Sequence, residues 1–166
     1  MKTKKLYFLV VPVLIILGFG LFVATDKVFY LKECQKLKTN CQNSLLFIDY
    51  LKSKSSLSNL NLDKRELSHM QDVKKLYEAL EFIFILLAVF VVSVLVFLLI
   101  RDKKTYRAFI VDYLYLGGLF TIMILLIAAV VSFISFDFIS EVFHRVFFRQ
   151  GTYLFSSQST LIRLFP

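Results

Sequence analysis

The sequence holds few of the residues that most often carry enzyme chemistry. Its 166 residues include two histidines and two cysteines, with no Cys-x-x-Cys pair and no Cys/His spacing typical of a zinc site. The Gly-x-Ser-x-Gly motif of serine hydrolases is also missing. These absences argue against a zinc site and against a covalent acyl-enzyme, so histidine is the simplest remaining carrier of chemistry.

Apolar residues, by contrast, are in excess. Hydrophobic residues make up 58% of the chain, with 19 phenylalanines, which is more than one soluble core of this size buries. Uncharged runs occupy residues 6–23, 82–100 and 113–136, and about 18 or more helical residues cross a bilayer core of about 30 Å. We therefore predict an all-α integral membrane protein with three transmembrane helices and a small extracytoplasmic domain.

These runs divide the chain into six segments. We expect transmembrane helices within residues 1–25, 82–100 and 113–136, an extracytoplasmic domain at 26–81, a cytoplasmic link at 101–112 and an extracytoplasmic interfacial segment at 137–166. The first run follows three lysines, as a signal peptide does. Because it is longer than a typical signal core and no clear small-x-small cleavage site follows, we predict an uncleaved span.

Basic residues predict the orientation of the spans. Lysine and arginine gather before the first run and in the short link at 101–107, and short cytoplasmic loops are enriched in these residues. The N-terminus is therefore expected in the cytoplasm and residues 26–81 and 137–166 outside. With a formal charge of +8, the outer surface can attract the headgroups of membrane lipids. Nucleic acid is not an expected partner, because the lysines of residues 26–81 face away from the cytoplasm.

A helix is predicted to begin after Asp63. Asp63 is a good N-cap, and Glu66 follows three residues later, as in a capping box. Apolar residues then recur at helical spacing, at Leu67, Met70, Val73, Tyr77 and Leu80. A continuous helix over residues 64–100 is about 55 Å long and exceeds the bilayer core by about 25 Å, so we expect a break or a strong tilt near residues 74–81.

The two cysteines, Cys34 and Cys41, lie in the predicted outer domain. On one helix, residues seven apart are separated by about 10 Å along the axis, which is too far for a disulfide. In a loop the same two residues can pair. Both arrangements remain open.

The histidines, His69 and His144, both fall in the predicted outer segments. His144 lies about 12 Å beyond the third run along a helix, near the level of lipid ester carbonyls. Imidazole is the side chain best suited to proton transfer near neutral pH. A pair of half-buried interfacial histidines without chemistry is the alternative.

Acidic residues accompany each histidine. Glu66 precedes His69 by three residues and Glu141 precedes His144 by three, and repeated Glu-x-x-His is half of a di-metal site. The runs supply no further carboxylates, so no metal is expected. Asp72 can orient His69, and Glu141 can orient His144, through one ring nitrogen. Solvated helix faces are the competing interpretation of these acids.

Two motifs resemble those of a known family. "LDKRELSHMQDVKKL" (62–76) resembles the Arg-Glu-x-x-His, then Asp-Val, motif of the Lit family, the bacterial lipoprotein intramolecular transacylases. "FHRVFFRQGTYLFSSQSTLIRLFP" (143–166) resembles the second family motif: Phe-His, two residues, Phe-Phe, an aromatic residue, then Leu-Ile and Pro. Tyr153 stands where many relatives have tryptophan. The family pattern continues into a fourth span, so the resemblance implies that this chain ends before it.

The resemblance implies a substrate and a reaction. The substrate is a diacylglyceryl lipoprotein in the bacterial cell membrane, whose sn-2 acyl chain moves to the α-amine of the N-terminal cysteine to give the lyso-form lipoprotein. No cofactor is implied. The rival functions are a non-catalytic accessory or pH-sensing protein, and another lipid acyltransferase or hydrolase. Nothing in the sequence predicts an oligomeric state.

The reaction assigns expected roles to residues in both motifs. His144 is the expected base, and His69 is its partner or an oxyanion donor, with the two roles exchangeable. Arg65 is expected to help bind the oxyanion or a headgroup. An apolar seat for the acyl chains is expected from Phe143, Phe147, Phe148 and Tyr153. Because a short link joins spans two and three, the two histidine-bearing helices should lie side by side and hold one ester between them.

Overall fold

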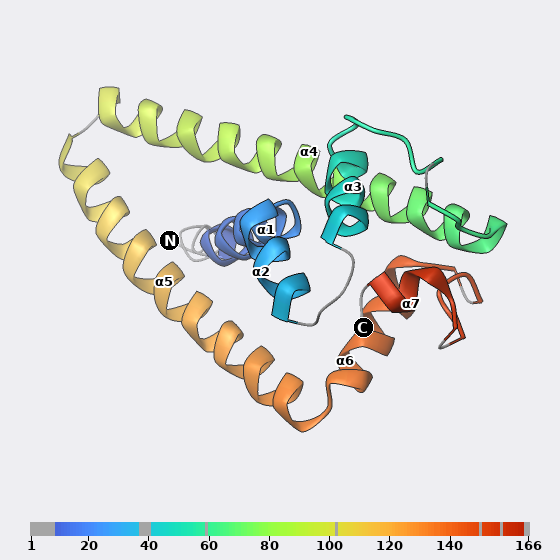
Figure 1. Ribbon diagram of the computed structural model, residues 1–166. Helices are drawn as coiled ribbons and strands as arrows, with labels where there is room; N and C mark the ends of the chain where they lie inside the picture. Colours follow the sequence, from blue (N-terminus) through green and yellow to red (C-terminus); the bar gives the residue numbers. More distant parts are fainter. Residues whose placement is uncertain are drawn as a thin grey trace. The chain divides into compact units, whose positions relative to one another are not determined.

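The computed structural model describes residues 9–36, 41–58, 60–101, 103–149, 151–156 and 158–164, and this part of the chain is helical without strands (Figure 1). The helices are α1 (Val10–Ala24), α2 (Lys27–Lys36), α3 (Cys41–Leu51), α4 (Lys64–Arg101), α5 (Lys103–Ile134), α6 (Phe136–Phe147) and α7 (Thr160–Leu164). The predicted all-α class is confirmed.

Two helices are long and apolar enough to cross a membrane. They are α4, whose apolar part is residues 82–100, and the stretch Phe109–Ile134 of α5. A third span results if α1 and α2, which meet at a bend of 59°, are counted as one broken span. The described residues thus form a multi-pass helical membrane protein with two to three candidate spans.

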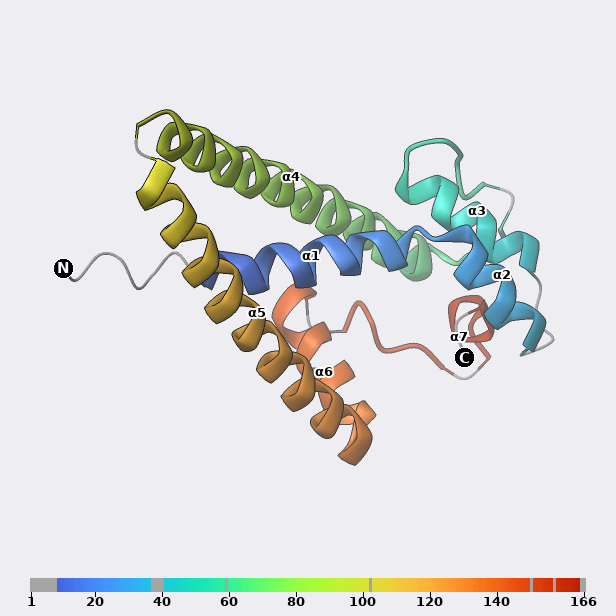
Figure 2. The same cartoon turned by 90° about the vertical axis from the view of Figure 1, so that its left-hand side faces the viewer.

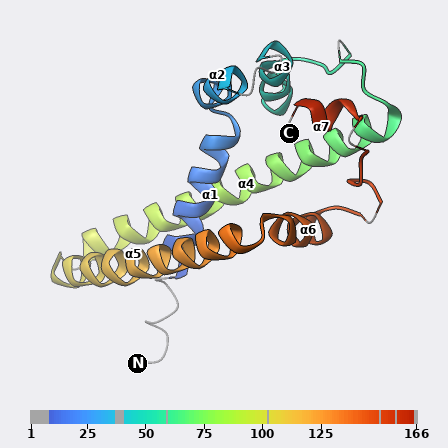
Figure 3. The same ribbon diagram turned by 60° about the horizontal axis from the view of Figure 1, so that its bottom comes forward.

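Helix α4 is unbroken over its 38 residues, as Figure 3 shows. Of the break or strong tilt expected near residues 74–81, the break is therefore wrong, and the tilt stays a prediction. Residues 64–101 contain neither glycine nor proline, so nothing in the local sequence interrupts the hydrogen-bond ladder. The predicted link is also largely helical, because α5 begins at Lys103.

The chain forms two compact units. Unit 1 comprises residues 1–20 and 80–139, and unit 2 comprises residues 21–79 and 140–166. Unit 1 therefore contains the apolar parts of α4 and α5, and unit 2 contains both histidines. Each unit is assembled from two separate stretches of sequence.

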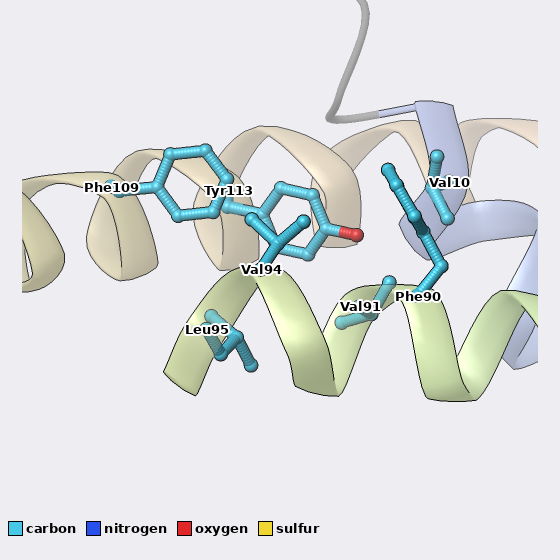
Figure 4. A pocket seen from close by; sticks show the side chains of 7 residues that line it. All are labelled: Val10, Phe90, Val91, Val94, Leu95, Phe109 and Tyr113. Carbon is cyan, nitrogen blue, oxygen red and sulfur yellow. The ribbon is translucent and has the colours of Figure 1, made fainter. Parts of the chain in front are cut away.

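In unit 1 the helices meet at a few close approaches. A Cβ added at Gly117 would lie 2.6 Å from Cβ of Val11, so α1 and α5 approach here only because the glycine has no side chain. Between α1, α4 and α5, a small apolar cavity is lined by Val10, Phe90, Val91, Val94, Leu95, Phe109 and Tyr113 (Figure 4). No titratable group other than the Tyr113 phenol lines it, so it offers no acid–base site.

In unit 2, α2 and α3 lie side by side (Figure 2). Cys34 and Cys41 form a disulfide with their Cα atoms 5.4 Å apart, which settles the alternative left open by the sequence. The two cysteines lie on different helices, so their spacing along one axis does not apply. An ion pair between Lys27 and Asp49, with Nζ and Oδ1 2.7 Å apart, joins the same two helices.

The core of unit 2 lies between α3, the loop after it, the start of α4 and the C-terminal segment. Its buried members are Leu57, Leu60, Met70 and Leu161, with Leu46, Phe47, Tyr50, Leu62 and Phe155 packed against them. At the end of α3, Ser53 adopts a left-handed conformation with φ of 56°. The amide of Lys54 donates to the carbonyl of Asp49 at 2.7 Å and that of Ser53 to Tyr50 at 3.0 Å, which is the Schellman pattern of a helix end.

Candidate active site

The start of α4 fixes the position of His69. The Asp63 side chain accepts a hydrogen bond from the Glu66 amide at 2.7 Å, and the Glu66 carboxylate accepts one from the Asp63 amide at 2.9 Å. This reciprocal pair is the predicted capping box, and it is confirmed. His69 follows in the second turn, beside the buried Met70.

The carboxylate of Glu66 also holds a distant part of the chain. Only 2% of Glu66 is exposed, and its Oε1 accepts a hydrogen bond from the amide of Leu161 in α7 at 3.1 Å. Two further bonds join the same segments: Arg65 donates to the carbonyl of Gly151 at 2.8 Å, and Thr160 donates to that of Asn61 at 3.1 Å. Residues 151–156 and 158–161, called the C-terminal strap here, are thereby held against the start of α4, where Figures 1 and 3 show α7.

His69 is almost completely buried, with 8% of its surface exposed. Its ring lies 4.8 Å from the ring of Phe148 and 5.5 Å from that of Phe155, centroid to centroid. Nδ1 of His69 is buried and has no hydrogen-bond partner among the described residues. Burial lowers the pKa of His69 below its usual 6.5, and the positive charge of His144 lowers it further, whereas Asp72 acts in the opposite direction. Burial and the neighbouring imidazole therefore favour the neutral form of His69.

His144, near the end of α6, is half-buried. Its Nδ1 lies 2.7 Å from the carbonyl oxygen of Ser140, one turn earlier on the helix. A carbonyl only accepts, so Nδ1 carries a proton and Nε2 holds the lone pair when the ring is neutral. The ring stacks on Tyr153 at 5.0 Å and lies 5.6 Å from Phe148. This tautomer leaves Nε2 available as a base.

The two imidazoles lie together in unit 2. Their centroids are 6.1 Å apart and their planes are inclined by 27°, so the proximity expected from the sequence is confirmed. Phe148 touches both rings and is itself buried, with 8% exposed. The pair is thus packed by aromatic side chains from α6 and the C-terminal strap.

The expected carboxylate partners lie elsewhere. Glu141 pairs with Arg145 on the exposed side of α6, with Oε1 and Nη2 2.5 Å apart, so the Ser140 carbonyl takes the place at His144 that we expected Glu141 to take. Asp72 lies 3.5 Å from the ammonium of Lys75 and acts on His69 only through its charge. In the described part of the chain, no group of three or more potential metal ligands occurs.

The four aromatic residues expected to seat the acyl chains divide into two sets. Phe148 is buried and Tyr153 half-buried, and both contact an imidazole. Phe143 and Phe147 are 44% and 47% exposed and pack on one another at 4.9 Å; of these two, Phe143 also lies edge-on to His144 at 5.7 Å.

Three contributors to the site were not predicted from the sequence. The Ser140 carbonyl is backbone and leaves no mark in the sequence beyond its place four residues before His144. Phe155 and the second hydrogen bond of Glu66 come from contacts about 90 residues apart along the chain, which no local pattern reports. The Glu141–Arg145 pair, in contrast, follows from its i, i+4 spacing and was predictable.

Comparison with known proteins places this geometry in context. The sequence model of one protein family, described as "Lipoprotein intramolecular transacylase Lit", matches residues 5–166. An uncharacterized protein of Aquifex aeolicus (strain VF5) is 35% identical over 106 residues, which cover 61% of this chain and 43% of that protein. The matched region thus spans less than half the length of this curated relative. No solved structure matches the chain.

Proposed function

Because the chain belongs to the Lit family of lipoprotein intramolecular transacylases, we propose that it moves the sn-2 acyl chain of a diacylglyceryl lipoprotein to the α-amine of the N-terminal cysteine. The product is the lyso-form lipoprotein. The observation that carries the proposal is the pair of imidazoles, 6.1 Å apart in an aromatic enclosure. The enclosure is apolar enough for a lipid ester and contains both a base and a donor.

The reaction needs one proton to move from nitrogen to oxygen. The amine nitrogen attacks the ester carbonyl carbon, a C–N bond forms, and the bond from that carbon to the glycerol oxygen breaks. The amine loses one proton and the glycerol oxygen gains one. The α-amine has a pKa of about 8, so much of it is ammonium near neutral pH and first loses one proton to the surrounding water. The neutral amine then attacks, and a base is required to take the proton that the nitrogen loses as the amide forms. Since amine and ester belong to one molecule, holding them together removes much of the entropic barrier.

The tautomers distribute the roles between the histidines. His144 donates through Nδ1 to the Ser140 carbonyl, so its Nε2 takes the amine proton and later returns it to the glycerol oxygen. Burial lowers the pKa of His69 and so favours its neutral form, in which a proton on the buried, unpartnered Nδ1 would be left without an acceptor. Its proton therefore sits on Nε2, from which it donates to the oxyanion of the tetrahedral intermediate.

Other site residues support this pair. Tyr153 and Phe143 are partly exposed and lie beside His144, which suits contact with the acyl ester. Arg65 holds the C-terminal strap through Gly151 and keeps further N–H groups for a headgroup. Asp72 partly offsets the low basicity of His69, and Glu141 balances the charge of Arg145.

Two observations support an extracytoplasmic site. The basic residues before the first span and in the link at 101–107 favour a cytoplasmic location for those segments. The disulfide of unit 2 fits an oxidising compartment. Reporter fusions after Lys104 and after Ser58 test this orientation: the first should report the cytoplasm and the second the outside. The reverse result would place unit 2 in the cytoplasm, on the other side of the membrane from the lipoprotein substrate, and would contradict the proposal.

Mass spectrometry of a lipoprotein from cells with and without the protein tests the reaction. A transacylase leaves the mass of the N-terminal lipopeptide unchanged and moves one chain from an alkali-labile ester to a stable amide. His144→Ala and His69→Ala should each lower turnover by about 10² or more, whereas Gln71→Ala, at an exposed position of α4, should not. A lipopeptide lighter by one acyl chain would instead identify a hydrolase, and an unaltered lipopeptide would favour a non-catalytic protein.

A further inference from the structure

Helix α6 presents two different faces over its second half. One face carries Val142, Phe143, Val146 and Phe147, which are 44%, 44%, 68% and 47% exposed. The other carries Ser140, Glu141, His144 and Arg145. With about 100° between successive helical residues, Val146 lies nearly opposite His144. The helix therefore turns its imidazole inward to the aromatic enclosure and leaves an uncharged apolar strip uncovered.

This strip continues directly from a membrane span. Only Ser135 separates α5 from α6. The Ser135 amide donates to the Val131 carbonyl at 2.9 Å, and the Ser135 hydroxyl accepts from the Phe138 amide at 3.3 Å. Ser135 therefore ends α5 and caps the start of α6, so α6 follows the span with one residue between them. The apolar run of α5 carries no charge from residue 113 to residue 136. The strip thus begins where the lipid-covered part of the chain ends.

We infer that the apolar face of α6, formed by Val142, Phe143 and Val146 with Phe147 at its edge, enters the lipid leaflet and fixes the depth of His144. The occupant is the acyl region of membrane phospholipid. A narrow uncharged strip bordered by arginine is the pattern of a helix lying in the membrane interface. Arg145 and Arg149 are exposed at its polar side and end, where phosphate groups can accept from their guanidinium groups.

One consequence concerns Phe143 and Phe147, which the sequence analysis assigned to the substrate. Phe143 lies on the lipid-facing strip, about 100° from His144 around the helix, with its ring edge-on to the imidazole at 5.7 Å. Phe147 stands at the border of the strip, about 60° from His144. The boundary between lipid and site therefore runs along a single helix. An ester at the level of the lipid headgroups meets the imidazole without crossing water. The membrane contact itself does not depend on the proposed reaction.

The absence of tryptophan from the sequence makes this contact measurable with single introduced reporters. Val146→Trp places an indole on the apolar strip, and Arg145→Trp places one on the neighbouring polar face as the matched control. Loss of the exposed Glu141–Arg145 pair costs little. Both full-length variants are reconstituted in phospholipid bilayers and titrated with lipids brominated in the acyl chain and with aqueous iodide.

We expect blue-shifted emission from Val146→Trp, with strong quenching by brominated lipid and weak quenching by iodide, and the reverse pattern from Arg145→Trp. Equal iodide quenching in the two variants would overturn the inference, because the strip would then face water. Blue-shifted emission that neither reagent quenches would also overturn it, since the strip would be covered by protein. None of these outcomes requires turnover, so failure here is distinct from failure of the proposed reaction.

Discussion

Large apolar side chains behave in opposite ways in the two units. In unit 1, Ile100 and Phe133 are 81% and 94% exposed, whereas Ile48 and Met70 in unit 2 are 0% and 4% exposed. Unit 1 is built to meet lipid, so burial in protein is not what holds it together, and its helices touch at a few close approaches. Unit 2 is built to exclude water from a small core, and a disulfide and a buried carboxylate hold its separate segments. Damage should therefore act by different routes in the two units.

The largest stability effect is expected at Glu66. Glu66→Ala removes the capping-box partner of Asp63 and the hydrogen bond to Leu161, and should destabilise unit 2 by about 3 kcal/mol. Protease resistance of unit 2 during thermal unfolding in detergent measures the loss. Glu66→Gln keeps an acceptor for only one of the two amides, so its stability should lie between those of Glu66→Ala and the parent protein. If Glu66→Ala matched the parent protein, the carboxylate would not be a link between α4 and α7.

The disulfide comes next. Replacing Cys34 and Cys41 together by alanine opens a short loop between α2 and α3, and the loop-entropy model gives a loss of about 2–3 kcal/mol. The double variant should melt earlier than the oxidised parent and at the same temperature as the reduced parent. If a reductant also lowered the melting temperature of the double variant, the reductant would be destabilising the protein by a route other than breaking this disulfide.

In unit 1, substitutions at two neighbouring glycines distinguish the effect of helix packing on stability from that of helix propensity. Gly117→Ala places a Cβ 2.6 Å from that of Val11, whereas a Cβ at Gly118 meets nothing within 4 Å. Forcing α1 and α5 apart should cost about 1–3 kcal/mol, while Gly118→Ala should be neutral or slightly stabilising. The melting temperatures of the two variants in detergent measure the difference. Equal melting temperatures would show that α1 and α5 do not pack closely at Gly117.

The smallest expected effect is on pH dependence. The folded pKa of His69 lies below 6.5 through burial and the charge of His144, so the unfolded chain binds this proton more readily. The stability that the neutral ring contributes is present above a pH of about 6.5 and declines as pH falls toward the folded pKa. Unit 2 should therefore melt earlier on mild acidification. His69→Phe should flatten this dependence, and an unchanged slope in that variant would assign it to another group.

Features set by neighbouring residues were predictable from the sequence. Asp63 and Glu66 stand three residues apart, and the capping box forms as the spacing indicates. The apolar runs become the long helices, and Gly151 adopts the positive φ of 85° that a turn requires. The break expected in α4 was inferred because a helix over residues 64–100 is longer than the bilayer core. It does not form, since residues 64–101 contain no glycine or proline to interrupt the helix.

Features set by distant residues were not predictable. The enclosure of His69 needs Phe148 and Phe155, and neither position is marked by periodicity. That the cysteines pair depends on a helix ending between them, at Lys36, and another beginning at Cys41. The topology of the spans predicted that the two histidines lie on the same side of the membrane and near one another, but their separation of 6.1 Å is set by packing.

The bond between Glu66 and Leu161 has a consequence for synthesis. Its two residues are 95 positions apart, and the whole of α5 is translated between them. At about 5–20 residues per second, a ribosome needs roughly 5–20 s to cover that distance. During this interval the nascent chain has His69 without the strap that encloses it. The enclosure of His69 can therefore form only after α5 has been translated, and a ribosome that stalls within α5 leaves a product with His69 outside this enclosure.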